Sequence, residues 1–153
     1  MKQLFLTIAL AMTGMSYAQW KQGEYVDEFG DKTGTKYNYI QATGVFSNSA
    51  STNAECIFFL EEGQGMVGIT IYPYGGDTKE RWIESAYNEV RIKCPDGEVV
   101  ALLGFFYDQG MILFSDSEYK MFMDTISPGG TFTVSTKYKG KYSTSSYLFK
   151  FKV

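Results

Sequence analysis

The chain has 153 residues, with 14 basic and 17 acidic side chains, no histidine and a formal net charge of −3. This length suits one domain with one hydrophobic core, and a mildly acidic chain without a basic run argues against nucleic acid as a partner. The missing histidine removes Ser–His and Cys–His nucleophile pairs and the usual nitrogen ligand of zinc.

The first 18 residues indicate a signal peptide. Lys2 supplies the positive charge of the amino-terminal region of a signal peptide. The apolar residues 4–12 are far fewer than the ~20 that span a bilayer. Ser16 and Ala18 are the small residues that precede a cleavage site, so we expect cleavage before Gln19. The protein is then exported, and it is either periplasmic or secreted.

Removal of this segment leaves residues 19–153, which we expect to form a single β-sandwich domain. The segment carries one basic residue and no acidic one, so the charge of the mature chain is 13 − 17 = −4. No later segment is long and apolar enough to cross a bilayer. We therefore expect no stable membrane insertion.

The first part of the mature chain alternates tyrosine and valine with acidic residues and glycines. Val26 and Phe29 are expected to anchor one strand, residues 30–34 to form a turn, and residues 36–40 to return as the next strand. The glycines at both ends of the predicted turn favour this arrangement.

The same segment contains a calcium candidate, because Asp27, Glu28 and Asp31 could offer carboxylate oxygens. The spacing does not fit an EF-hand loop. With Asp27 as position 1, position 3 is Phe29 and position 6 is Lys32, where the loop needs an oxygen ligand and a glycine. We therefore favour a structural turn and expect no metal and no cofactor.

Alternation of apolar and polar residues with a period of two continues along most of the chain and predicts short β-strands joined by glycine-containing turns. Within residues 66–73, Val67, Ile69 and Ile71 share one face. Residues 99–107 are apolar on both faces, which favours a central strand. The predicted strands in this part of the chain cover residues 54–61, 66–73, 87–94, 99–107, 111–114, 131–138 and 145–153.

One segment breaks this period, and it predicts a short amphipathic α-helix near residues 116–126. Apolar residues recur there at the spacing i, i+3, i+4 and i+7 of a buried stripe. Ser115 and Glu118 have the spacing of a capping box, and the proline and glycines of residues 127–130 end the helix. The stripe consists of Tyr119, Phe122, Met123 and Ile126.

Together these elements predict a mostly β protein, an antiparallel β-sandwich or barrel of about eight or nine strands with one short α-helix. No internal repeat or linker indicates a second domain. Residues 135–146, near the last predicted hairpin, carry several lysines. This modest basic patch indicates solvation and protection of an edge strand.

Two cysteines, Cys56 and Cys94, form a disulfide candidate. In an oxidising compartment an isolated pair is more often a disulfide than a catalytic or metal site, and their spacing fits no zinc pattern. The alternative is two buried thiols, because the sequence does not set the distance between them.

Motifs for catalysis are missing from the sequence. Glu61 and Glu62 could be nominated as a carboxylate pair for glycoside hydrolysis, but they are adjacent at a predicted hairpin turn, where strand alternation points them apart. No glycine-rich loop opens a helix as a phosphate cradle. We therefore expect a protein that is not an enzyme.

Aromatic residues make up 17% of the chain and favour a binding function. Trp82 lies in a polar segment, and Tyr72 and Tyr74 approach that segment along the chain. Exposed Trp and Tyr side chains stack on sugar rings and act as interface hot spots. The alternative is that tyrosines suit strands and that Trp82 covers an edge of the sandwich.

Two segments, "DEFGDKTGTKY" and "GVFSNSAS", together with the signal peptide, resemble a group of small, uncharacterised exported proteins of Bacteroidetes-type bacteria. The layout is more distantly similar to TagO-like type VI secretion accessory proteins and to invasion-associated-locus-B-like proteins. Trp20, "VRIKCPDGE" and "FSDSEYKMFMDTIS" carry that similarity. The resemblance implies an exported β-sandwich without a known catalytic site, and it assigns no functional residue.

Two functional hypotheses follow from the sequence. The first is an exported, non-catalytic β-sandwich protein that binds a protein or cell-envelope partner. The second is a carbohydrate-binding module that uses exposed aromatic residues around Trp82. The expected partner is therefore a protein or a glycan.

Overall fold

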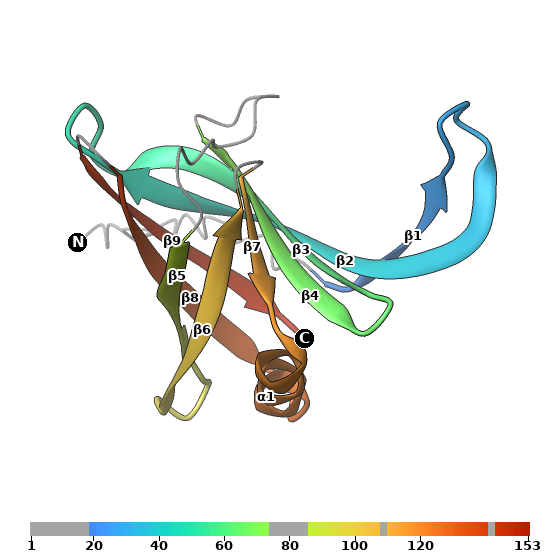
Figure 1. Ribbon diagram of the computed structural model, residues 1–153. Coiled ribbons are helices and arrows are strands. Elements are labelled where there is room, and N and C mark those ends of the chain that lie inside the picture. The colour runs from blue at the N-terminus through green and yellow to red at the C-terminus, as the bar shows by residue number, and fades with distance from the viewer. Residues whose placement is uncertain (1–18, 74–85, 108–109, 141–142) are drawn as a thin grey trace, which may run out of the picture.

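The computed structural model describes residues 19–73, 86–107, 110–140 and 143–153 (Figure 1). In this part of the chain it contains nine β-strands and one α-helix. They are β1 (Lys21–Val26), β2 (Lys32–Ser47), β3 (Ala54–Gly63), β4 (Met66–Pro73), β5 (Ala86–Lys93), β6 (Val99–Tyr107), β7 (Met111–Phe114), α1 (Asp116–Ile126), β8 (Thr131–Lys139) and β9 (Thr144–Lys152).

Eight of these strands close into an antiparallel barrel. Their order is β2-β3-β4-β7-β6-β5-β8-β9, and β9 pairs again with β2 through residues 44–47 and 146–149. The remaining strand, β1, pairs with β2 outside this ring. The predicted mostly β fold of eight or nine strands with one helix is confirmed, and it takes the barrel form, in which closure removes the sheet edges.

The barrel interior is filled by side chains from alternate positions of its strands. Val67, Ile69 and Ile71 are all buried on β4, as their shared face predicted. The rings of Phe58 on β3 and Phe149 on β9 stack with their centroids 4.3 Å apart, which joins strands that lie on either side of β2. An eight-stranded barrel is just wide enough for such packing, and the buried residues form one hydrophobic core.

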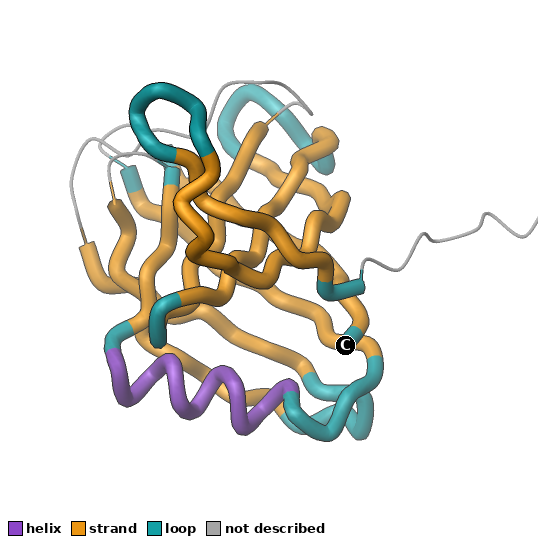
Figure 2. The backbone as a smooth tube through the Cα atoms, turned by 90° about the vertical axis from the view of Figure 1, so that its right-hand side faces the viewer, coloured by secondary structure: helices purple, strands orange, loops and turns teal. Residues whose placement is uncertain are grey.

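The helix α1 covers one end of the barrel, as Figures 1 and 2 both show. Its bounds match the predicted residues 116–126. Phe122 and Ile126 of the predicted stripe are buried, and Tyr119 and Met123 pack against the core while partly exposed. Among the described residues, no helix combines the length and the hydrophobicity required to cross a membrane.

The predicted capping box at the start of α1 is wrong. Ser115 is the N-cap residue, but its side chain makes no capping hydrogen bond. Glu118 instead accepts a hydrogen bond from the backbone N–H of Leu103, at 3.1 Å between N and Oε2. The carboxylate therefore ties the helix to β6, because tertiary contact offers it a partner that the local spacing does not reveal.

Strand β6 is paired on both sides, as predicted for a central strand, but it buries only one face. Leu102 and Phe106 are buried, whereas Val99 and Leu103 are 43% and 49% exposed. The reason is the closed architecture: each barrel strand has one inner face, and within the described residues no second layer covers the outer face of β6.

The disulfide prediction is wrong, because Cys56 and Cys94 do not lie at disulfide distance from each other. Cys56 is buried on β3, and Cys94 follows β5. The strands β4, β7 and β6 lie between β3 and β5 in the sheet. Burial raises the pKa of the Cys94 thiol, and the neighbouring carboxylates of Asp96 and Glu98 raise it further, so its reactive thiolate form is disfavoured.

Candidate functional site

A two-stranded ribbon extends from the barrel and is its most distinctive surface feature (Figure 1). Strand β2 has 16 residues, but β3 pairs with it only along residues 38–46. In the described structure, residues 32–37 of β2 therefore pair with β1 alone. We call residues 21–37 the arm. It consists of β1, the turn that follows it and residues 32–37 of β2.

The tip of the arm is a turn over residues 27–31, so the prediction that Phe29 anchors a strand is wrong. One oxygen of the Asp27 carboxylate accepts hydrogen bonds from the backbone N–H groups of Phe29 and Asp31, both at 2.9 Å. The backbone N–H of Asp27 donates to the carbonyl of Asp31 at 2.8 Å. Asp side chains commonly organise turns in this way.

This turn holds a large apolar side chain in water. Phe29 is 83% exposed, and Val26 beside it is 59% exposed. Gly30, which follows Phe29, has φ +87°, a left-handed conformation that suits glycine. Hydrogen bonds and a glycine therefore fix the backbone conformation at the tip, while the ring of Phe29 stays exposed to solvent.

The calcium candidate occupies the same turn. Asp27, Glu28 and Asp31 all lie in it or beside its apex, but one Asp27 oxygen is already used by two backbone N–H groups. Within the described ranges, no group of three or more His, Cys, Asp or Glu side chains is placed to hold a metal ion. The turn thus has a structural explanation that does not involve a metal.

A bulge bends the arm. Between the pairs Glu24↔Lys36 and Val26↔Lys32, β2 has three residues opposite one residue of β1. Gly34 lies in this bulge with φ +78°, and its N–H donates to the Glu24 carboxylate at 3.0 Å. Bulges increase local bending and twist, and Figure 1 shows the ribbon curving as it leaves the barrel.

A row of aromatic rings connects the arm to the outer face of the barrel. The centroid distances between successive rings are 4.6, 5.9, 6.3 and 5.6 Å, within the range of favourable aromatic contacts. A two-stranded ribbon is marginal by itself, so these contacts stabilise the arm. This aromatic row consists of Tyr25, Tyr37, Tyr39, Phe59 and Tyr72.

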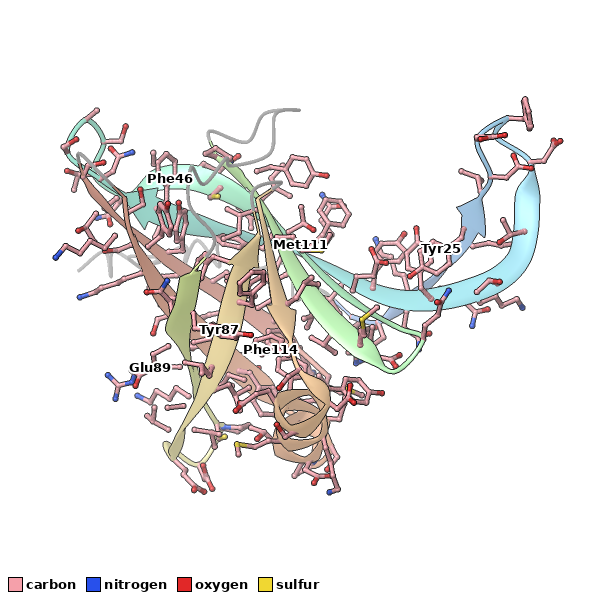
Figure 3. All side chains as sticks on the ribbon, viewed as in Figure 1. Tyr25, Phe46, Tyr87, Glu89, Met111 and Phe114 are labelled. Carbon is pink, nitrogen blue, oxygen red and sulfur yellow. The ribbon has the colours of Figure 1, made fainter. Side chains whose placement is uncertain are left out.

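The row also contains a strong hydrogen bond. The Tyr25 hydroxyl donates to Oε1 of Glu61 on β3 at 2.7 Å, and Figure 3 shows Tyr25 on the inner side of the curved arm. Burial, followed by this hydrogen bond and the charge of Glu61, raises the pKa of Tyr25 to about 12 from its ordinary value of 10.0. Burial and Glu61 also raise the pKa of Tyr72.

This pKa shift predicts alkaline weakening of the protein that depends on Tyr25. The unfolded chain loses the phenol proton near pH 10.0 and the folded chain near pH 12, so the folded state binds more protons between these values. The contribution to stability is complete below pH 10 and is lost as the pH rises towards 12. Denaturant unfolding at several pH values in this window should show a smaller decline for Tyr25→Phe than for the wild type.

An equal decline in both proteins would contradict the Tyr25–Glu61 bond. The measurement should be paired with NMR titration of isotope-labelled tyrosines, because the phenols of Tyr72 and Tyr119 also have raised pKa values. In that titration, the resonance that moves at about pH 12 should be missing from Tyr25→Phe.

The carboxylates of Glu61 and Glu62 bind different parts of the molecule. Glu61 accepts from Tyr25 on the arm, whereas Glu62 accepts from Asn38 Nδ2 at 2.9 Å and from the hydroxyl of Tyr119 on α1 at 3.1 Å. The predicted divergence of the two side chains is confirmed. Both are engaged in structural hydrogen bonds.

The residues proposed for carbohydrate binding are only partly described. Trp82 and Tyr74 lie outside the described residues. Tyr72 is half-buried at the end of the aromatic row, where its ring meets Phe59 at an interplanar angle of 70°. The carbohydrate hypothesis therefore stays a prediction, and Tyr72 has a packing partner whether or not a sugar binds.

Apart from the calcium candidate in its turn, the sequence does not indicate the arm as a site. Tyr37 and Tyr39 lie two positions apart on one strand, a spacing that places both side chains on the same face. Nothing in the sequence indicated that Tyr25 and Phe59 lie on the same face beside them, since that depends on strand register. The exposure of Phe29 likewise depends on the placement of the turn.

Comparison of the chain with protein-family models, with curated proteins and with solved structures finds no match.

Proposed function

We propose that the protein is an exported, non-catalytic binding protein that engages a protein partner through the arm. The observation that carries this proposal is Phe29, 83% exposed on a hydrogen-bonded turn at the end of a ribbon outside the barrel. Aromatic residues, phenylalanine included, are enriched at the core of protein–protein interfaces.

The energetics favour binding over a purely structural role for Phe29. Burying a Phe side chain stabilises an association by about 1.5–3 kcal/mol, and the folded monomer leaves this gain unused. The turn is already organised by Asp27, so little conformational freedom is lost when a partner covers the tip. A rigid aromatic tip is therefore a favourable anchor.

The charges around the tip define the partner's chemistry. Asp27, Glu28 and Asp31 are exposed beside Phe29, and Lys32 follows them with its ammonium 3.5 Å from the Glu24 carboxylate. Opposite charge across an interface accelerates encounter and fixes orientation. The partner should offer an apolar pocket with a basic rim.

Export is a separate part of the proposal, and it rests on the signal-peptide pattern of residues 1–18. Amino-terminal sequencing of the protein recovered from the periplasm or the medium of the producing cells tests it. A mature chain that begins at Gln19, with its amino group free or cyclised, is the expected result. A cytoplasmic chain that begins at residue 1 would contradict it.

A photo-crosslinking amino acid at position 29 tests the arm. In the producing cells, illumination should give a discrete adduct at this position, which mass spectrometry can assign. The same amino acid at Gln41, an exposed position on the barrel strand β2, is the control and should give no adduct. Equal labelling from both positions, or none from position 29, would overturn the proposal.

Phe29→Ala is expected to weaken binding of the partner found in this way by about 30-fold or more, the loss typical of a hot spot of ~2 kcal/mol. Its stability should stay within about 0.5 kcal/mol of the wild type, because the side chain is almost entirely exposed. Titration calorimetry measures the first quantity and denaturant unfolding the second. Unchanged affinity would assign the contact to another surface.

A further inference from the structure

The outer face of β8 and β9 is basic, although the chain as a whole is acidic. These two strands contain four lysines and no acidic residue. The lysines of residues 135–146 were expected to protect an edge strand, but β8 lies between β5 and β9, and β9 lies between β8 and β2. Edge protection therefore does not explain the basic face. The lysines are Lys137, Lys139, Lys150 and Lys152.

A hollow of about 450 Å³ lies in this face, where β5 and β8 separate. The described pairing of these strands runs from Lys93↔Thr133 to Val90↔Thr136 and ends there. The volume of the hollow falls within the ~300–1,000 Å³ range of pockets that accept small ligands and side chains.

The hollow combines cations with an apolar patch. Arg91 and Lys137 supply positive charge, and Val45 and Leu148 supply apolar surface, with Leu148 43% exposed. Glu89 also lines the hollow, 3.5 Å from Arg91. Both partners of that ion pair are more than half exposed, so it neutralises Arg91 only weakly.

We propose that this hollow receives the arm tip of a second copy of the chain. This inference rests on the proposed function, because it names the partner that the arm engages. Phe29 of one copy covers the apolar surface at Val45 and Leu148, while Glu28 and Asp31 face the cations of the hollow. The chain's own surface therefore offers both features expected of the partner, a basic rim and an apolar patch.

The two surfaces cannot meet within one molecule. In Figure 1 the arm projects on one side of the barrel, and β5, β8 and β9 form the opposite side. Figure 3 shows the same separation between Tyr25 on the arm and Glu89 at the hollow. The contact is therefore head-to-tail between copies, which produces a ring if it closes and a filament if it does not.

Charge reversal with rescue tests the contact on the purified chain. The arm variant is Glu28→Lys with Asp31→Lys, which leaves Asp27 and the turn intact. The hollow variant is Arg91→Glu with Lys137→Glu. Lys120→Glu, on the exposed face of α1, is the matched control.

Sedimentation velocity and light scattering over a concentration series should show association of the wild type and of the control, and monomers for either reversed variant alone. An equimolar mixture of the two variants should associate again, because each arm then meets a hollow of opposite charge. Raising the ionic strength to 1 M shortens the Debye length from ~8 Å to ~3 Å and should weaken the assembly.

A wild-type chain that stays monomeric at its solubility limit would overturn the inference, and so would association that both reversals leave unchanged. A monomer that binds an anionic polysaccharide through Arg91 and Lys137 would also overturn it.

Crosslinking from position 29 separates the two proposals. An adduct with the chain's own hollow supports both, an adduct with another protein supports only the proposed function, and no adduct overturns both.

Discussion

Phe58→Ala is expected to lower the free energy of unfolding by about 3–5 kcal/mol, the range for truncating a buried phenylalanine. Phe58 is fully buried on β3, and its ring stacks on Phe149 with an interplanar angle of 18°. Removing the ring leaves a cavity between β3 and β9, the two strands that flank β2 in the barrel. Denaturant unfolding monitored by circular dichroism measures the loss.

The magnitude of this change is large relative to a typical domain stability of ~5–15 kcal/mol. The matched control is Phe29→Ala, which removes the same atoms from an almost fully exposed position and should change stability by no more than about 0.5 kcal/mol. Similar losses in the two variants would contradict a barrel that closes around Phe58. The pair also separates the role of an aromatic residue in the core from its role at the arm tip.

Gly44→Ala is expected to destabilise the barrel at its closure, by about 3 kcal/mol or slightly more, the upper part of the range for overpacking. Gly44 pairs with Cys56 on one side and with Phe149 on the other. A Cβ added there would lie 2.2 Å from the carbonyl oxygen of Leu148 and 2.6 Å from the Cβ of Phe149. A backbone carbonyl cannot rotate away without disturbing the ladder.

Only four residue pairs join β2 to β9, so this short ladder has little capacity to absorb the clash. Hydrogen exchange should therefore accelerate for the amides of β9 before it does for those of β4. Thr43→Ala, at the neighbouring outward position, is the control and should cost less than ~1 kcal/mol. A Gly44→Ala protein as stable as the wild type would mean that β9 does not close on β2 at this register.

These core predictions are independent of the proposals for the arm. The arm has an exposed tip, and its contact with the barrel runs through the aromatic row. Tyr25→Phe should loosen that contact while Phe29→Ala should leave it unchanged. If partner binding responds to both variants, the arm must be held in place to bind; if it responds only to Phe29→Ala, the tip alone is sufficient.

Local sequence determined the elements of this protein. The helix at residues 116–126 has its apolar stripe and its proline–glycine end within one short segment, so no distant contact is needed to define it. Period-two alternation likewise determined the inner face of β4, because successive side chains of a strand point to opposite faces. These patterns limited the fold to a sandwich or a barrel.

The tertiary structure alone decided which strands meet, and with that the candidate site. Alternation reports the two faces of one strand but says nothing about its neighbours or its register. Strand β2 pairs with β9, and Tyr25 contacts Glu61, although these residues are remote in sequence. Cys56 and Cys94 are likewise remote in sequence, and the fold keeps them apart. The arm exists because β2 continues past the end of β3, a difference in strand length that becomes visible only when the two strands are paired.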